Sequence, residues 1–302
     1  MRTTFINTLV ELARDDPSIF LITPDLGYAV LEKFAKAFPD RFLNIGIAEQ
    51  NAVGIASGLA LSGYKVYMYS IIPFVTMRCF EQVRLDIAYM NTDVKLVGVG
   101  EGYSYGPAGA THHAIEDIAI MRVLPNMKVC CPGDPYEVRK IVEQSAEIRG
   151  PMYIRLGKNN EPTIHNTTDN VTIGKASVLR SGEDFALVTT GNMLELGASW
   201  VREWEAQGYN PEFVSMHTVK PLDKDIITSL IARNMNIIAL EEHSVLGGLG
   251  SAISEVIAGF NTEVKLIECG IPDIYSHYVG SGKAIAAHYG LFQIPSVKDV
   301  GL

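Results

Sequence analysis

The feature that most constrains the fold is the regular alternation of short apolar runs with longer helical patterns. Up to residue 156 the apolar runs are rich in Val, Ile, Leu and aromatic residues. Such runs, interleaved with helices, are typical of a parallel sheet that helices cover on both faces. The expected strands are 18–23, 42–47, 65–71, 94–100, 127–132 and 151–156. The expected helices lie near 3–14, 29–38, 49–62, 74–90, 115–122 and 135–148.

A polar stretch, residues 157–170, interrupts this series and indicates a surface linker, because Asn, Thr, Gly and Pro are frequent in it. A second α/β series follows it. Its expected strands are 185–190, 211–216, 236–242 and 263–269, and its expected helices lie near 193–206, 223–233 and 249–259. We therefore predict two α/β domains, each a mostly parallel sheet with helices on both faces. The predicted boundaries are 1–160 for the first domain, 161–180 for the linker and 181–302 for the second domain.

Composition narrows the functional class. The chain has 302 residues, of which 47% are hydrophobic, enough for two domains with their own cores. The formal net charge of −9 argues against nucleic acid or an anionic membrane as the partner. No run approaches the roughly 20 apolar residues that cross a bilayer, and the first residues lack the apolar core of a signal peptide. The four cysteines form no C-x-x-C pair, so we expect a soluble protein of a reducing compartment, the cytoplasm.

One carboxylate stands in a segment that otherwise suits burial. Glu49 follows an apolar strand and opens the helix over 49–62, in which Gly, Ala and Ser recur. A glutamate in the first helical turn is often only a capping acid, because the helix dipole favours negative charge there. Ligands of parallel sheets, however, bind at the carboxyl ends of strands, and an acid in an apolar site can hold a proton. Glu49 is therefore the first functional candidate.

Two further segments follow strand ends. A glycine-rich loop after the fourth strand leads to His112 and His113, and paired histidines at such a position favour a functional role. His113 and Glu116 lie three residues apart, but no third ligand is in register, so we expect no metal site on this chain. Phe74 stands at a strand-to-helix turn rather than on a buried helical stripe, so its ring could stack on a planar group. Tyr69 is the alternative.

The segment EEHSVLGGLGSAISEV, residues 241–256, ends a strand in acids and opens a helix with glycines. A helix start of this kind can bind an anion. No lysine or Walker pattern accompanies it, so we favour tight packing as the reason for its glycines.

Three long motifs, in the same order, resemble the transketolase family of thiamine-diphosphate enzymes. They are FPDRFLNIGIAEQNAVGIASGLALSGYKVYMYS, THHAIEDIAIMRVLPNMKVCCPGDPYE and EEHSVLGGLGSAISEV. The resemblance covers nearly the whole chain and implies the family's pyrimidine-binding domain followed by its C-terminal domain. The implied activity is reversible transfer of a two-carbon ketol unit from a ketose to an aldose.

The resemblance assigns cofactor contacts. Glu49 matches the glutamate of the family's I-A-E-Q motif, which contacts N1′ of the aminopyrimidine ring of thiamine diphosphate. An acid held in a dry wall of small residues can share that proton at neutral pH. Phe74 matches the aromatic residue that stacks on this ring, with Tyr69 as the alternative. Asp25 matches an acid near the thiazolium ring.

The resemblance also assigns substrate contacts. His112 matches the histidine of the family's T-H-Q segment, which contacts oxygens of the substrate and the intermediate, and Arg155 and Arg2 match substrate-binding arginines. Several polar or cationic groups that the family uses at its substrate are missing here. The positions concerned are Gly100, Glu101, Ala108 and Ala29. Their loss weakens the case for phosphorylated sugars, although the two arginines leave phosphate binding open.

The motif that holds diphosphate and Mg²⁺ in this family is absent. It reads G-D-G with an Asn some residues later, and the sequence contains no G-D-G. The resemblance therefore implies a separate partner chain that supplies the diphosphate and Mg²⁺ site. It also implies an α2β2 assembly in which two copies of this chain meet through the Glu49 helix and the second domain.

Three other interpretations remain open at this point. The same two domains occur in the β subunit of a 2-oxoacid dehydrogenase E1 component and in half of a deoxyxylulose-phosphate synthase. A catalytically silent regulatory half is the non-enzyme interpretation. The segments THHAIED and SVLGGLG favour transketolase over E1, and the presence of Glu49 and His112 argues against a silent half.

Overall fold

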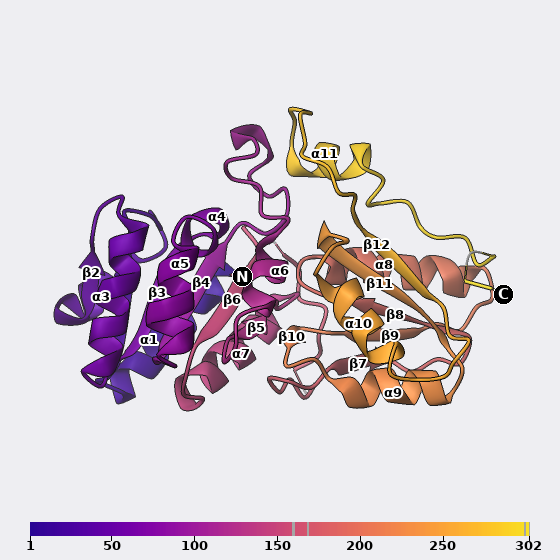
Figure 1. Ribbon diagram of the computed structural model, residues 1–302, viewed down its shortest axis with the longest axis horizontal. Helices are drawn as coiled ribbons and strands as arrows, with labels where there is room; N and C mark the ends of the chain where they lie inside the picture. The colour runs from indigo at the N-terminus through magenta and orange to yellow at the C-terminus, as the bar shows by residue number, and fades with distance from the viewer. Residues whose placement is uncertain (159–160, 168, 299, 302) are drawn as a thin grey trace.

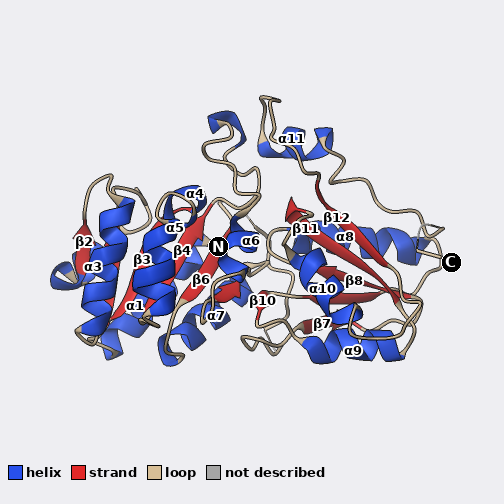
Figure 2. Cartoon of the chain, in the orientation of Figure 1, coloured by secondary structure: helices blue, strands red, loops and turns tan. Residues whose placement is uncertain are grey.

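Two α/β sheets, one in each half of the chain, make up the molecule (Figure 1). The computed structural model describes residues 1–158, 161–167, 169–298 and 300–301. The strand order is β10-β5-β6-β4-β3-β1-β2 in the first sheet and β12-β11-β8-β9-β7 in the second. Helices cover both faces of each sheet (Figure 2), which confirms the predicted fold class. Within the described residues, none of the helices has the length and apolar character to cross a membrane.

The first sheet contains the six predicted parallel strands. They are β1 (Ile19–Thr23), β2 (Phe42–Asn44), β3 (Lys65–Ile71), β4 (Val94–Val99), β5 (Lys128–Cys130) and β6 (Met152–Leu156). One face packs against α1 (Arg2–Asp15), α2 (Glu32–Ala37) and α7 (Pro135–Glu147). The other packs against α3 (Glu49–Leu61), α4 (Ile72–Thr76), α5 (Phe80–Gln82), the π-helix η2 (Val83–Tyr89) and α6 (Asp117–Arg122). Two short 3₁₀ turns, η1 (Pro39–Arg41) and η3 (Gly106–Ala108), complete this half.

The helix expected at 74–90 is not continuous. A turn at 77–79 separates α4 from α5, and the chain then continues as a π-helix. Such interruptions are often found at functional sites. By contrast, α7 begins where its sequence predicts, because the Asp134 carboxylate accepts the N–H of Glu137 at 2.8 Å and Pro135 occupies the first turn.

The second sheet has four parallel strands and one antiparallel edge strand. The parallel strands are β8 (Phe185–Thr189), β9 (Glu212–Ser215), β11 (Asn236–Ser244) and β12 (Leu266–Ile271). The edge strand β7 (Ser177–Arg180) pairs with β9. It was not predicted, because it lies inside the expected linker, residues 161–180. Residue 168 of that linker lies outside the described residues. One face carries α8 (Met193–Ala206) and α11 (Gly282–His288), and the other carries α9 (Lys224–Ala232) and α10 (Leu249–Ile257).

The two halves are joined by an exchanged strand. β10 (Thr218–Lys220) belongs by sequence to the second half but pairs antiparallel with β5 of the first sheet. Beside it, the N–H of Cys131 donates to the carbonyl of His217 at 2.7 Å. Tyr103 from the first half packs into a hydrophobic core of the second, and Ala252 from the second packs into a core of the first. The halves therefore share both backbone hydrogen bonds and apolar packing.

Candidate active site

The candidate residues gather where the central strands of the first sheet end. Asp25, Glu49, Phe74 and His112 follow β1, β2, β3 and β4, which are neighbours in the order β4-β3-β1-β2. Because these strands are parallel, their carboxyl ends meet at one edge of the sheet. This is the edge at which ligands bind in open α/β sheets.

Glu49 is a buried carboxylate rather than a solvent-facing cap. It begins α3, but its side chain is only 3% exposed and does not cap the helix. Its Oε2 accepts a hydrogen bond from Nη1 of Arg78 at 2.9 Å. Arg78 was not predicted from the sequence, although it follows Phe74 by four residues, about one helical turn.

A continuous set of contacts joins Glu49 to His112. The Cζ atom of Arg78 lies 4.1 Å from the centroid of the Phe74 ring. On the same ring, His112 packs edge-on with a centroid distance of 5.0 Å and an interplanar angle of 70°. The structure thus brings together the acid, the aromatic ring and the histidine that the sequence predicted.

The surroundings of His112 favour the neutral form of its imidazole. Partial burial lowers its pKa below the usual value, and the positive charges of Arg78, His113 and Lys158 lower it further. Its Nδ1 lies 2.9 Å from the hydroxyl of Thr111. A neutral ring can accept a proton from a substrate hydroxyl or donate a hydrogen bond to a substrate oxygen. The adjacent His113 is buried against Tyr103, with its Nε2 3.2 Å from the carbonyl of Gly106, and has a structural role.

The ring of Tyr105 packs beside the ring of His112. Gly100 has φ = +92°, and a Cβ there would lie 2.1 Å from the Tyr105 ring, so this glycine is required for the close approach. The Nζ of Lys158 lies 4.1 Å from the centroid of that ring. The Nε of Arg2 donates to the carbonyl of Lys158 at 2.6 Å, so Arg2 is also at this edge. Lys158 was not predicted either, although its position two residues after β6 could have indicated it.

Two predicted cofactor residues lie away from this contact set. Tyr69 is 1% exposed and stacks on Phe5 of α1 within the core, so its ring presents no open face. Asp25, with φ = +54°, accepts from Nδ2 of Asn44 at 3.0 Å and from the hydroxyl of Tyr28 at 3.3 Å. Asp25 lies at the same sheet edge, beside the end of β2.

Arg155 does not reach this surface. Its guanidinium is fully buried and pairs with Asp117 and Glu101, each at 2.8 Å. It also donates to the carbonyls of Ala114 and Glu242 at 2.9 and 3.0 Å. Arg155 therefore links β6 to the second half of the chain, and a substrate would have to displace these partners to contact it.

Backbone N–H groups at the start of α10, just after the glycine-rich turn, already have hydrogen-bond partners within the chain. Both carboxylate oxygens of Glu241 accept backbone N–H groups of α10, from Leu249 at 2.7 Å and from Gly250 at 2.9 Å. A Cβ on Gly248 would lie 2.0 Å from the same carboxylate. These contacts agree with the packing role expected for its glycines.

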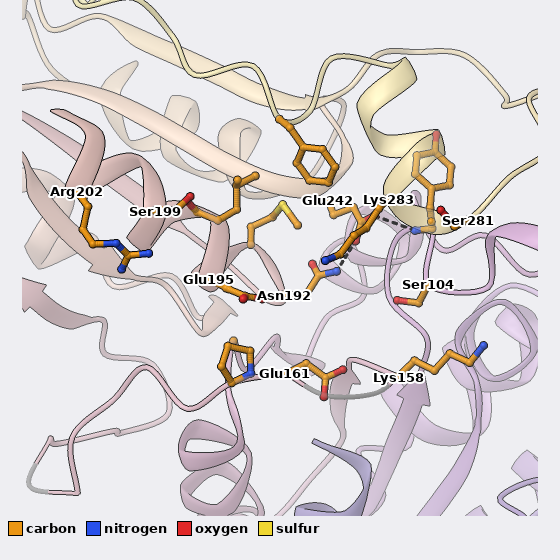
Figure 3. A pocket seen from close by; sticks show the side chains of 17 residues that line it. Ser104, Lys158, Glu161, Asn192, Glu195, Ser199, Arg202, Glu242, Ser281 and Lys283 are labelled. Carbon is orange, nitrogen blue, oxygen red and sulfur yellow. Dashed lines mark hydrogen bonds between the residues drawn. The ribbon is translucent and has the colours of Figure 1, made fainter. Parts of the chain in front are cut away.

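A cavity of about 770 Å³ lies between the two halves (Figure 3), and Lys158, which contacts the Tyr105 ring, is among the residues that line it. Its polar lining mixes both signs of charge, and its side chains come from both halves of the chain. They include Lys158, Glu161, Asn192, Arg202, Glu242 and Lys283. Figure 3 shows Asn192 hydrogen-bonded to Glu242, which also accepts the N–H of Tyr103 at 3.1 Å. Among the described residues, no group of three or more His, Cys, Asp or Glu side chains is placed to hold a metal ion.

Comparison with known proteins accounts for both halves. The family described as transketolase, pyrimidine binding domain, matches residues 1–163, and the family described as transketolase, C-terminal domain, matches residues 174–292. A putative transketolase C-terminal section from Methanocaldococcus jannaschii is 37% identical over 96% of this chain and 92% of its own length. One subunit of an apulose-4-phosphate transketolase from Phocaeicola vulgatus is 37% identical over 96% of this chain and 93% of its own length.

One solved structure is similar throughout. It is described as a split gene transketolase, inactive beta4 tetramer, and superposes with a TM-score of 0.89 at 36% sequence identity. The match covers 99% of this chain and 95% of that one.

Proposed function

The chain belongs to the transketolase family, and from that premise we propose that it is one subunit of a split, thiamine-diphosphate-dependent transketolase. The enzyme transfers a two-carbon ketol unit between sugars. The observation that carries this proposal is the contact set of Glu49, Phe74 and His112 at the carboxyl ends of adjacent strands. Relatives that are named as a section or subunit of a transketolase match this chain over nearly their full length.

The residues at this edge fit the aminopyrimidine of thiamine diphosphate. Glu49 offers a buried carboxylate that already accepts a hydrogen bond, and Phe74 offers a ring on which a flat group is stacked. When bound, the cofactor supplies an electron sink for the C–C bond that is cleaved. Glu49 would hold the proton at N1′, Phe74 would orient the ring, and His112 would exchange protons and hydrogen bonds with substrate oxygens. The Glu49 side chain is only 3% exposed, so little water reaches its carboxylate.

The diphosphate and Mg²⁺ belong, in this proposal, to a partner chain that carries G-D-G and a downstream Asn. The assembly is α2β2, with two copies of this chain in contact through α3 and the second domain. The beta4 tetramer described for a similar chain supports self-association. We place the enzyme in the cytoplasm, in keeping with the four free cysteines.

Substrate contacts on this chain come from His112, Arg2 and Lys158 in our proposal, whereas Arg155 supports them from the core. Tyr105 narrows the space over Gly100. An E1-type subunit and a deoxyxylulose-phosphate-synthase half remain the alternatives. The E1-type alternative is separated by assay, because that enzyme decarboxylates pyruvate-like acids and reduces a lipoyl acceptor, whereas a transketolase transfers ketol units between sugars.

The proposal predicts that Glu49→Ala, assembled with the partner chain, loses ketol transfer by at least about 100-fold, because the proton at N1′ has no acceptor. Glu81→Ala, which removes an exposed acid on α5, serves as the matched control and should keep its rate. Transfer is measured with a coupled sugar assay, and circular dichroism shows that both variants fold. A near-normal rate for Glu49→Ala contradicts the assignment.

A further inference from the structure

The ion pair of Arg78 with Glu49 lies where the proposed function requires a ring to bind. Nη1 of Arg78 is 2.9 Å from Oε2 of Glu49, and Cζ of Arg78 is 4.1 Å from the centroid of the Phe74 ring. One guanidinium thus contacts both groups that we assign to the aminopyrimidine. This interpretation of Arg78 rests on the proposed function.

A guanidinium has the shape and the donors to take the place of that ring. It is planar, it stacks on aromatic faces, and its N–H groups donate to a carboxylate. An aminopyrimidine offers the same combination of a flat face and a protonated ring nitrogen. The two groups cannot occupy the face of Phe74 and the Oε2 atom of Glu49 together.

The arginine side chain can leave without disturbing a helix. Arg78 is 44% exposed, whereas Glu49 is 3% exposed, so the guanidinium covers the acid from the solvent side. The Arg78 backbone is anchored separately: its N–H donates to the carbonyl of Pro73 at 3.0 Å, and its carbonyl accepts from Nε2 of Gln50 at 3.2 Å. The residue lies in the turn at 77–79 between α4 and α5. Rotation of the side chain alone would therefore open the face of Phe74.

We propose that Arg78 is a built-in placeholder that occupies the pyrimidine site of the isolated chain and must swing out before thiamine diphosphate can bind. The arginine keeps the buried carboxylate paired until the cofactor replaces it. It also competes with the cofactor, so the apparent affinity is the affinity of the open site multiplied by the fraction of chains whose site is open. Diphosphate and metal contacts from the partner chain then supply the free energy that displaces the arginine.

The test is a comparison of cofactor binding to the full chain without its partner. Arg78→Ala should bind thiamine diphosphate about tenfold more tightly than the wild type, the gain expected if one site in ten is open in the wild type. The pyrimidine fragment 4-amino-5-hydroxymethyl-2-methylpyrimidine should show the same gain. Isothermal titration calorimetry measures both ligands. Arg84→Ala, which removes an exposed arginine from η2, is the matched control and should bind as the wild type does.

Chemical rescue supplies a second measurement. Methylguanidine at millimolar concentration should re-fill the site of Arg78→Ala and weaken binding of the fragment, whereas methylammonium at equal ionic strength should not. If Arg78→Ala does not fold, Arg78→Gln, which keeps the stem and loses the charge, takes its place. Unchanged affinity, or no binding, overturns the placeholder role. Weaker binding also overturns it, because Arg78 would then be a ligand of the cofactor.

Failure of this inference and failure of the proposed function give different results. If the complex with the partner chain transfers ketol units but Arg78→Ala gains no affinity, only the placeholder role is wrong. If the complex shows no thiamine-dependent transfer, the proposed function is wrong, and a gain in Arg78→Ala affinity for the fragment has then to be explained without it.

Discussion

At the scale of single residues, two arginine–carboxylate clusters have opposite exposure. Arg78 is partly exposed and pairs with one buried acid, whereas Arg155 is fully buried and faces several. Arg155 has Asp117 and Glu101 as direct partners, and Glu242 lies next to Glu101. One buried cation cannot neutralise three buried carboxylates, so one acid is favoured in its protonated form.

Burial raises the pKa of Glu242 and so favours its protonated form. It also raises the pKa of Glu101, to about 8 from an ordinary 4.5; Arg155 opposes that rise and Glu242 adds to it. Between these two pH values the folded chain binds more protons than the unfolded chain at this site, so the free energy of unfolding falls as the pH rises. Glu101→Gln should remove this component. Urea unfolding of both proteins at several pH values from 5 to 9 measures it; parallel pH profiles would contradict the assignment.

The residues of the site differ in how far the sequence could predict them. Glu49, Phe74 and His112 could be found because each directly follows or closely follows a recognisable strand. The family resemblance assigns Arg155 to the substrate, but its partners Asp117 and Glu101 lie 38 and 54 residues away. Periodicity carries no information about which distant acids meet a buried arginine. The same holds for the pairing of Arg78 with Glu49, 29 residues apart.

At the scale of elements, the loop after β4 is held by the C-terminal segment through backbone-to-backbone contact. A Cβ on Gly106, in η3, would lie 2.6 Å from the carbonyl oxygen of Gly280. A Cβ on Gly282, at the start of α11, would lie 2.3 Å from the carbonyl oxygen of Tyr103. The loop that ends in His112 therefore depends on α11, an element that was not predicted from the sequence.

Gly106→Ala should loosen this junction, because a methyl group has no room between two backbones. We expect a loss of about 1–3 kcal/mol in the free energy of unfolding, the usual cost of overpacking. Limited proteolysis should then cut the loop between β4 and α6 faster. Gly54→Ala on α3, where a Cβ meets nothing within 4 Å, is the control and should cost nothing. Equal proteolysis of both variants would show that the junction does not order the loop.

Long apolar elements were predictable and short or irregular ones were not. Each parallel strand expected in the first half has its counterpart in β1 to β6, because continuous β-rich runs between helices have few other solutions. The three-residue strand β10 has no such pattern, and its pairing with β5 is fixed by contacts between the halves. The break in the helix expected at 74–90 could not be predicted either, because residues 77–79 include no Gly or Pro.

At the scale of the whole molecule, one face of the chain exposes apolar side chains over two adjacent helices. α3 and η2 are joined by the hydroxyl of Ser57, which donates to the carbonyl of Asp86 at 2.7 Å. Leu61 on α3 is 65% exposed, and Tyr89 at the end of η2 is 78% exposed. Exposed apolar groups of this kind mark contact sites, in keeping with the proposed meeting of two copies at α3.

Tyr89→Glu should therefore weaken self-association, because a buried charge would replace an apolar contact. Loss of about 2 kcal/mol, typical of a residue central to an interface, raises the dissociation constant roughly 30-fold. Ala37→Glu, exposed at the end of α2 on the face of the first sheet opposite α3, introduces the same charge on another surface and should leave association unchanged. Sedimentation velocity over a concentration series measures both; equal behaviour would place the dimer contact elsewhere.

The exchanged strand β10 sets a limit on how this polypeptide can be divided. A fragment that stopped before residue 218 would leave β5 with an unpaired row of N–H and C=O groups, a template for aggregation. A fragment that began after the linker would carry β10 without β5, the strand with which it pairs. Engineering that truncates or transplants one half must carry the strand together with its recipient, so the smallest portable unit of this protein is the pair of halves.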